Sequence, residues 1–309
     1  MTKVFIHGSS GTTGLRLRER LMERADVELL EIDYEARRDA VEIKKYIAAS
    51  DITFLCLPDD AAIEAVAEAG DTAIIDTSTA HRTRPDWAYG FPELSDNHRA
   101  AILSSRRVSV PGCHAGGCLA LLYPLIQSGM IQKDYPLAFH SLTGYSGGGK
   151  DMIADYENAA RTLEFSRPRQ YSFPQKHKHL PEITAVASLA YEPAFVPVVE
   201  DFYSGMLVTL PLHTRLLSGK PTMNGVWNAL NAHFDGSALI RVMPLGLEGY
   251  LDAGGLIGRD DMEIYVTGND DRVVLAARFD NLGKGASGAA VQCFNLMTGA
   301  NETEGLVLN

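Results

Sequence analysis

Apolar residues occur in short runs along the first third of the chain, and a polar or glycine-containing stretch follows each run. Runs rich in Val, Ile, Leu and Phe predict strands, and the helically spaced segments between them predict helices. This alternation predicts a parallel sheet with helices on both faces, an α/β fold of the Rossmann type. The expected strands cover 3–7, 27–33, 51–58, 72–76 and 108–110, with helices over 15–21 and 60–69.

The pattern changes after residue 113, where several strand-like runs follow one another. Such a succession predicts an α+β domain with a mixed sheet. The expected strands cover 136–143, 194–199, 205–214, 263–267 and 272–280, with a helix over 224–234. A last helix begins near residue 285, and its small residues permit close approach to another backbone, so we expect it to pack on the first domain. The expected domains are 1–113 with 286–309 for dinucleotide binding, and 114–285 for substrate and catalysis.

The first predicted strand leads into a glycine-rich turn and then a helix. Glycines in such a turn let the backbone approach a pyrophosphate, which then lies at the N-terminus of the helix. The spacing is GxxGxxG rather than the commoner GxGxxG, so an ordinary strand–helix turn is the alternative interpretation. The candidate cofactor-binding residues in this turn are Gly8, Ser10, Gly11, Thr12, Thr13 and Gly14.

The residues after the second predicted strand bear on which dinucleotide binds. Asp33 stands where an acidic residue binds the ribose hydroxyls of NAD. Arg37 and Arg38 follow closely, and they are candidates either for the 2′-phosphate of NADP or for a solvated loop. The sequence by itself leaves NAD and NADP both open.

Cys113 lies in the stretch Pro-Gly-Cys-His-Ala-Gly-Gly, between a predicted strand end and an apolar helical run. The free N–H groups and dipole of a helix N-terminus stabilise an anion, so a thiol in that position ionises more readily. The same N–H groups can hold the oxyanion that forms when sulfur attacks a carbonyl. A buried structural cysteine at a helix start is the alternative interpretation.

Two histidines, His177 and His179, precede a Leu-Pro-Glu-Ile run. On a strand they would point to opposite sides, and no further His/Cys pair lies nearby, which argues against a metal site. Histidine titrates near neutral pH, so a general acid/base is the better interpretation. His213 competes for that role.

Other residues are candidates for holding a substrate. Arg82 follows the strand predicted over 72–76, and Arg215 lies close to His213. A guanidinium can grip a carboxylate or phosphate with two hydrogen bonds, whereas a surface arginine is the alternative for Arg82. The glycine cluster at 144–150 predicts either a ligand loop or a flexible connector.

Composition and charge narrow the class of protein. The net charge is −11 and there is no run rich in Lys or Arg, which argues against nucleic acid as the main partner. No stretch has eighteen uninterrupted apolar residues, so we expect no membrane span. The four cysteines lack zinc-like spacing, so we expect no metal and a reducing compartment. The chain enters a strand without a signal-like segment, and we expect a cytoplasmic protein.

The stretches 8–14, 111–117, 146–149, 177–183 and 281–292 together resemble those of N-acetyl-γ-glutamyl-phosphate reductases in their shorter form, in the same order. The chain is more distantly similar to aspartate-semialdehyde dehydrogenases. The resemblance implies a nucleophilic Cys113, a general acid/base His179, the cofactor NADP(H) and a homo-oligomer, either dimer or tetramer. It also implies that the nicotinamide end is lined by Ser146, Gly147, Gly148, Asn281, Lys284 and Gly285.

The reaction implied by this resemblance is reduction of N-acetyl-L-glutamyl 5-phosphate by NADPH to the 5-semialdehyde and phosphate, a step of arginine biosynthesis. It proceeds through a thioester on Cys113, with Arg82, His213 and Arg215 as candidate substrate-binding residues. Two alternatives stay open. One is a related reductase for an aspartyl or aminoadipyl phosphate, and the other is a non-catalytic NADP-binding redox sensor that uses Cys113.

Overall fold

The computed structural model describes residues 1–308. It divides into two compact units. The first unit comprises Met1–Pro111 and Ala286–Leu306, and the second comprises Gly112–Gly285 with the chain end from Val307. Cys113, placed in the first domain by the sequence, belongs to the second unit because it begins a helix buried there.

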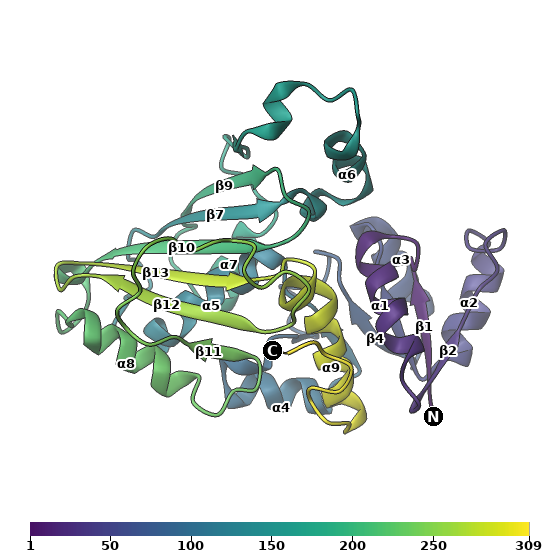
Figure 1. The fold of residues 1–309 in the computed structure, drawn as a ribbon. Helices are drawn as coiled ribbons and strands as arrows, with labels where there is room; N and C mark the ends of the chain where they lie inside the picture. Colours follow the sequence, from purple (N-terminus) through teal and green to yellow (C-terminus); the bar gives the residue numbers. More distant parts are fainter. Residues whose placement is uncertain (309) are drawn as a thin grey trace. The chain divides into compact units, whose positions relative to one another are not determined.

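The first unit is a parallel sheet with strands in the order β2-β1-β3-β4-β6-β5 (Figure 1). Its strands are β1 (Thr2–His7), β2 (Val27–Leu30), β3 (Ile52–Leu55), β4 (Ala73–Asp76), β5 (Ala88–Tyr89) and β6 (Arg107–Ser109). Its helices are α1 (Thr12–Met22), α2 (Ala40–Ala49), α3 (Asp59–Glu68), α4 (Asp96–Ser104) and α9 (Gly288–Thr298), with a 3-10 turn over Pro92–Leu94.

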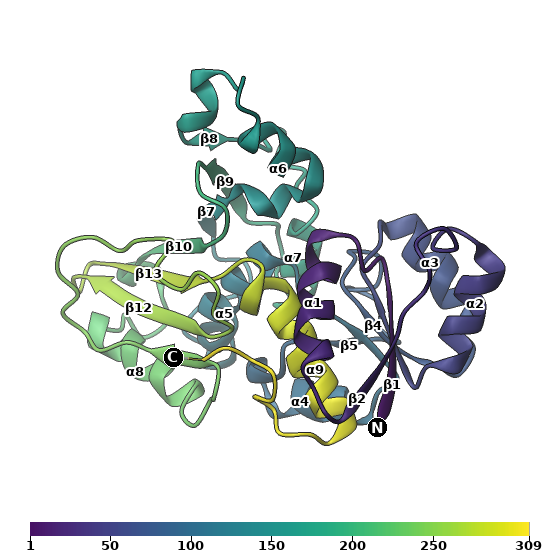
Figure 2. The ribbon, with the colours of Figure 1, turned by 45° about the vertical axis from the view of Figure 1, so that its right-hand side comes forward.

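Successive strand residues face opposite layers of this sheet, as a pleated strand requires. Val4 and Ile6 pack in one core with α1, α4 and α9, whereas Phe5 packs in the other core with α2 and α3. The last helix therefore completes the first unit, and Figure 2 shows α9 beside α1 and α4. This two-sided arrangement confirms the predicted doubly wound fold.

The second unit is built on a mixed sheet with strands in the order β11-β12-β13-β10-β7-β9-β8. The sheet contains antiparallel pairs and two parallel ones, β7 with β9 and β11 with β12, which confirms the predicted α+β domain. Its strands are β7 (Ala138–Gly144), β8 (Arg169–Gln170), β9 (Ala194–Glu200), β10 (Met206–His213), β11 (Ile240–Val242), β12 (Met262–Gly268) and β13 (Arg272–Phe279). Its helices are α5 (Cys113–Gln127), α6 (Gly149–Glu157), α7 (Leu180–Val186) and α8 (Met223–His233), with 3-10 turns at Tyr145–Gly148, Leu163–Ser166 and Thr214–Leu216. A π-helical turn, Gly283–Ser287, precedes α9.

Helix α5 is the centre of the second unit, and every residue from His114 to Leu125 is buried. A helix that is apolar on all sides needs neighbours on all sides. It packs on β10 and β13 and against α7 and α8. It approaches the sheet closely at Gly117, where a Cβ would lie 2.5 Å from a Val208 methyl and 2.8 Å from the Phe279 ring.

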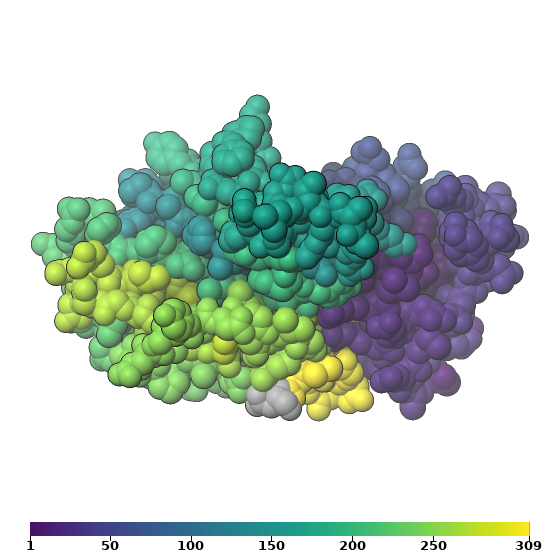
Figure 3. All heavy atoms as spheres, turned by 45° about the horizontal axis from the view of Figure 1, so that its top comes forward, coloured from purple at the N-terminus to yellow at the C-terminus, as the bar shows by residue number. Residues whose placement is uncertain are grey.

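A long excursion leaves the second sheet between β7 and β9. It carries α6, a 3-10 turn and the short β8, and it stands clear of the sheet in Figures 1 and 2 and faces the viewer, in teal, in Figure 3. Its short strand attaches it to the sheet, since Arg169 and Gln170 pair with β9. The glycine cluster forms a 3-10 turn and the start of α6, so it is an ordered element rather than a connector.

One further local prediction is wrong. The second strand ends at Leu30, three residues before Asp33, because the chain turns away from the sheet after that point. His179 is the N-cap residue of α7, and His177 precedes it by two residues. Among residues 1–308, no helix combines the length and the apolar character that crossing a membrane would need.

The contact at Gly117 predicts a stability effect. Gly117→Ala should lower the free energy of unfolding by about 1–3 kcal/mol, because its methyl group overpacks a core that cannot yield on both sides. Urea unfolding followed by circular dichroism measures this. Gly225→Ala in α8, where the added methyl would lie 3.3 Å from a Pro221 carbon, is the control. The better helix propensity of alanine should leave its stability unchanged or raise it by up to about 1 kcal/mol. Equal midpoints for the two variants would contradict the prediction.

Candidate active site

Cys113 is the first residue of α5, and Gly112 is its N-cap in an extended conformation. The first helical hydrogen bond runs from the Gly116 N–H to the Gly112 carbonyl, at 2.8 Å. Cys113 is half-buried and lies at the N-terminus of α5, as the sequence predicted, in the turn whose N–H groups have no partner within the helix. Cys118, one turn further on, is buried, and burial raises the pKa of its thiol well above the usual value. Cys118 is thus a packed and unreactive thiol.

Glu182 ties the start of α5 to α7. Its carboxylate Oε1 accepts a hydrogen bond from the Gly112 N–H at 2.9 Å, and the side chain is 2% exposed. Glu182 lies in the first turn of α7, three residues after His179. One hydrogen bond thus fixes the helix that carries the candidate acid/base relative to the helix that carries the candidate nucleophile.

His179 belongs to a cluster of three histidine rings, in which His114 and His179 are buried and His177 is half-buried. Its ring centroid lies 5.5 Å from that of His114 and 4.8 Å from that of His177. The three imidazoles contact one another edge to face or tilted, and among residues 1–308 no group of His, Cys, Asp and Glu side chains is arranged to hold a metal ion. The cluster places His179 beside the residue that follows Cys113.

His114 is the best-anchored ring of the cluster. Its Nδ1 lies 2.7 Å from Ser141 Oγ, and its Nε2 lies 3.0 Å from the Tyr171 hydroxyl. Burial lowers the pKa of His114 to about 3, and the positive charges of His177 and Lys178 add to the effect. At neutral pH the ring is uncharged, so one nitrogen donates and the other accepts.

Tyr171 is a site residue that the sequence did not single out, because it lies in a segment without periodicity. Burial raises the pKa of its phenol, and negative charge at Cys113 raises it further. The hydroxyl therefore keeps its proton at neutral pH, close enough to Cys113 to sense the charge of the sulfur.

Residues from two further segments complete the surroundings of Cys113. Asn281 accepts a hydrogen bond from the Gly205 N–H at 2.8 Å and donates one to Ser146 Oγ at 3.0 Å. A Cβ on Gly285 would lie 3.0 Å from the Cβ of Cys113. Both bonds of Asn281 and the tight contact at Gly285 bring the turn after β7 and the turn after β13 to one place.

The other predicted residues of this group occupy the same turns. Gly147 is exposed beside Asn281, and a Cβ there would lie 3.6 Å from Asn281 Nδ2. Gly148 adjoins Met152, and Lys284 is buried in the π-helical turn.

His213 and Arg215 lie far from this place within the second unit. His213 pairs with Arg272 at one end of the β10–β13 ladder, whereas Met206 pairs with Phe279 at the other. Gly285, which adjoins Cys113, also adjoins Phe279. The seven-residue separation along β10 corresponds to about 23 Å, so the structure does not bring the His213 end of the strand to Cys113.

Arg82 is held by the first unit itself. Its Nε donates to the Val110 carbonyl and its Nη2 to the Thr77 carbonyl, each at 2.9 Å. The residue is 9% exposed, so the surface-arginine alternative is wrong. These bonds pin the loop after β4 to the end of β6.

The glycine-rich turn of the first unit fits a dinucleotide. Gly8 has φ +91°, and a Cβ there would lie 2.3 Å from the Cys56 carbonyl oxygen. A Cβ on Gly14 would lie 2.3 Å from the Gly8 oxygen, so backbone fills the space that side chains would need. The remaining predicted residues of the turn, Ser10, Gly11, Thr12 and Thr13, lead into α1, whose N-cap is Gly11. This cradle, open at a helix N-terminus, suits a phosphate.

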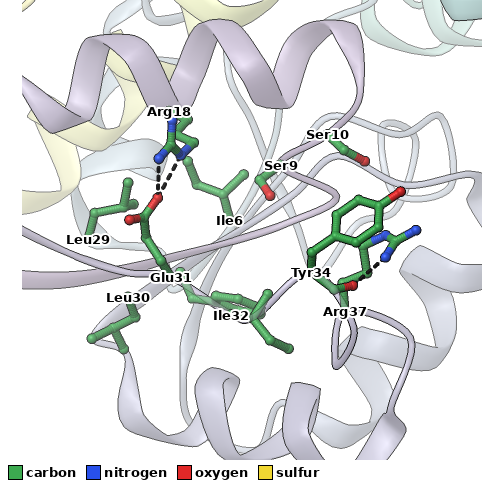
Figure 4. Close-up of a pocket in the computed structure, with 11 residues that line it drawn as sticks. Ile6, Ser9, Ser10, Arg18, Leu29, Leu30, Glu31, Ile32, Tyr34 and Arg37 are labelled. Carbon is green, nitrogen blue, oxygen red and sulfur yellow. Dashed lines mark hydrogen bonds and ion pairs between the residues drawn. The ribbon is translucent and has the colours of Figure 1, made fainter.

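A cavity of about 300 Å³ adjoins this turn (Figure 4). Glu31, rather than Asp33, is the acidic residue in its wall, since β2 ends at Leu30. Arg37 lines it, whereas Arg38 is exposed and outside the lining. The lining residues are Phe5, Ile6, Ser9, Ser10, Arg18, Leu29, Leu30, Glu31, Ile32, Tyr34 and Arg37. Apolar walls with a few polar groups suit an adenosine moiety.

Burial of the histidine cluster predicts a pH dependence of stability. The pKa of His114 is about 3 in the folded protein against 6.5 for an unperturbed histidine, and burial with the charge of Lys178 lowers that of His177 to about 4. The unfolded chain therefore binds more protons below pH 6.5, and stability falls as the pH drops from 6.5 towards 3. His114 alone should contribute a loss of about 3 kcal/mol between pH 7 and pH 4.

Urea unfolding at a series of pH values measures this loss. His114→Gln should flatten the profile, because glutamine can bond Ser141 and Tyr171 without gaining a proton. His140→Gln, at an exposed position, should leave the slope as it is. Parallel profiles for His114→Gln and the unaltered protein would refute the assignment.

Comparison with known proteins adds to this geometry. Residues 3–102 match the family model described as semialdehyde dehydrogenase, NAD binding domain, and residues 113–281 match the one described as semialdehyde dehydrogenase, dimerisation domain. The N-acetyl-gamma-glutamyl-phosphate reductase of Brucella anthropi is 45% identical over 306 residues, covering 96% of this chain and 98% of the relative.

Solved structures show the same fold. The aspartate semialdehyde dehydrogenase of Francisella tularensis superposes with a TM-score of 0.73 at 15% identity, covering 96% of this chain and 100% of its own. Aspartate semialdehyde dehydrogenase II of Vibrio cholerae gives a TM-score of 0.71 at 15% identity, covering 96% and 98%. At 15% identity, this similarity supports a shared fold and nothing further.

Proposed function

We propose that this chain, which belongs to the N-acetyl-gamma-glutamyl-phosphate reductase family, reduces N-acetyl-L-glutamyl 5-phosphate to the 5-semialdehyde and phosphate, a step of arginine biosynthesis. The observation that carries the proposal is the position of Cys113. It is the first residue of a buried helix, held at its N-cap by Glu182 and in contact with Gly285.

The chemistry begins with the thiolate of Cys113. Its sulfur attacks the acyl carbon, a C–S bond forms, and the C–O bond to phosphate breaks, so that phosphate leaves and a thioester remains. The N–H groups in the first turn of α5 are the donors for the oxyanion that forms during the attack. NADPH supplies the hydride that reduces the thioester carbonyl. Collapse of the resulting thiohemiacetal breaks the C–S bond, releases the aldehyde and restores the thiolate.

His179 is the proposed general acid/base. It would take the proton from the Cys113 thiol before attack and handle the proton on the thiohemiacetal oxygen. Its place in a ring cluster with His114 supports this role, as does the bond from Glu182 that fixes α7. His213 is not proposed, because it lies at the far end of β10.

The proposal also assigns residues to the cofactor and to the substrate. Ser146, Gly147, Gly148, Asn281, Lys284 and Gly285 would face the nicotinamide end of the cofactor. For the substrate, Arg82 and Arg215 keep no role in this proposal, since the one is engaged by backbone carbonyls and the other lies with His213. Tyr171 takes their place as a neutral donor near the sulfur.

The assembly and location of the protein belong to the proposal as well. Residues 113–281 match a model described as a dimerisation domain, which supports a homo-oligomer, a dimer or tetramer. A mechanism that needs a reduced Cys113 and NADPH suits a reducing, cytoplasmic compartment.

The activity test runs the reaction backwards. NADP⁺ reduction by N-acetylglutamate semialdehyde should require inorganic phosphate, and aspartate and aminoadipate semialdehyde derivatives should react far more slowly. Faster reaction of another semialdehyde would transfer the proposal to that substrate. Absence of phosphate-dependent reduction with every aldehyde would leave a nucleotide-binding redox sensor.

Replacing the nucleophile tests the mechanism. Cys113→Ser keeps the side-chain volume but removes the easily ionised sulfur, so kcat should fall by a factor on the order of 10³ or more. The variant should fold and bind NADPH unchanged, because the glycine-rich turn lies in the other unit. In the unaltered protein without cofactor, peptide mass spectrometry should locate the acyl adduct on Cys113.

Cys118→Ser is the matched control. It should keep most of the activity, because Cys118 is buried and its thiol stays protonated. An adduct on Cys118, or full activity in Cys113→Ser, would overturn the thioester mechanism.

A further inference from the structure

The cavity beside the glycine-rich turn contains an ion pair between Arg18 and Glu31 (Figure 4). Glu31 Oε1 accepts hydrogen bonds from Arg18 Nε at 2.6 Å and from Arg18 Nη2 at 2.5 Å. The two side chains are 39% and 52% exposed, so the pair lies at the mouth of the cavity and within reach of a ligand. Arg18 comes from the second turn of α1, and Glu31 directly follows β2.

The second arginine in the wall is engaged differently. The guanidinium carbon of Arg37 lies 3.3 Å from the centroid of the Tyr34 ring, and its Nη1 donates to the Tyr34 carbonyl. Both partners of Arg37 are uncharged, so its positive charge is not cancelled. The charge of Arg18 is cancelled by Glu31, so a bound phosphate could replace the Glu31 carboxylate as the partner of Arg18.

A carboxylate directly after the second strand and an arginine beside it have opposite preferences. The carboxylate accepts hydrogen bonds from the ribose hydroxyls of NAD(H), and it repels a 2′-phosphate. The arginine binds a phosphate with two charge-assisted hydrogen bonds and gains little from hydroxyls. Whichever of the two side chains contacts the ribose edge decides which dinucleotide binds better.

We propose that the Arg18–Glu31 pair sets the choice between NADP(H) and NAD(H). Arg18 exchanges the Glu31 carboxylate for the 2′-phosphate when NADP(H) binds, and Glu31 limits the resulting preference by competing for Arg18 and by accepting the ribose hydroxyls of NAD(H). The inference rests on the proposed function in one respect, because both require that a dinucleotide binds at this site. The sequence offered Arg37 and Arg38 as candidates for the 2′-phosphate; Arg38 lies outside the cavity, and this proposal makes Arg18 the main phosphate contact.

Two variants should shift the preference in opposite directions. Arg18→Met keeps the aliphatic stem and leaves Glu31 uncompensated, so the Kd of NADPH should rise about 10- to 100-fold while that of NADH changes less than about 3-fold. Glu31→Gln frees Arg18, so NADPH should bind about 3- to 10-fold more tightly and NADH more weakly. Titrations that follow the fluorescence of each reduced nucleotide, on the full chain without substrate, measure all four constants.

Arg38→Met is the matched control and should leave the ratio of the two Kd values unchanged. Circular dichroism establishes that each variant is folded, and Glu31→Gln tests the pair even if Arg18→Met is unstable. Unchanged ratios in both variants, a loss of NADPH affinity in Arg38→Met alone, or an unaltered protein that binds neither nucleotide would overturn the proposal. Because no acyl phosphate is present, shifted ratios support this inference even if the proposed reaction fails, and an active enzyme with unshifted ratios contradicts this inference alone.

Discussion

The hydrogen bond between the Gly112 N–H and the Glu182 carboxylate is the constraint on which the second unit depends. It joins the start of α5 to the first turn of α7, and both partners are buried, so losing either would leave an unsatisfied polar group in the interior. Helix α5 cannot shift to compensate, since Gly117 already lies against the sheet. The positions of Cys113 and His179 thus follow from backbone packing more than from their own contacts.

This constraint explains why neighbouring thiols on one helix differ in character. Cys113 lies where N–H groups are unpaired within the helix, whereas Cys118 lies one turn deeper among apolar side chains. The sequence alone shows two cysteines five residues apart. The depth of α5 in its unit, which depends on its packing against the distant elements α7, α8, β10 and β13, decides which of them is reactive.

The sequence predicted what local pattern determines. The strand–turn–helix start, the helix after Cys113 and the change to a mixed sheet follow from periodicity and glycine placement, and the structure confirms them. It failed where tertiary contacts decide. Asp33 was singled out and Glu31 was not, because an apolar run does not show where a strand leaves its sheet. The pairing of Arg18 with Glu31 joins a helix and a strand end, which no local pattern shows. Tyr171 had no signal in the sequence, since its position depends on a histidine 57 residues away.

The core of the first unit is discontinuous in the chain, because α9 contributes Ala290, Val291 and Phe294 to the face formed by β1, β3 and β4. On the ribosome, residues 1–111 emerge well before this helix exists, and synthesis of the intervening segment takes on the order of ten seconds or more. During that interval α9 is missing from one apolar face of the nascent sheet, which α1 and α4 cover only in part, while the second unit, which is nearly continuous in sequence, can already close. The first unit, although it is synthesised first, would therefore complete its folding last. Chaperone binding should concentrate on its incomplete sheet.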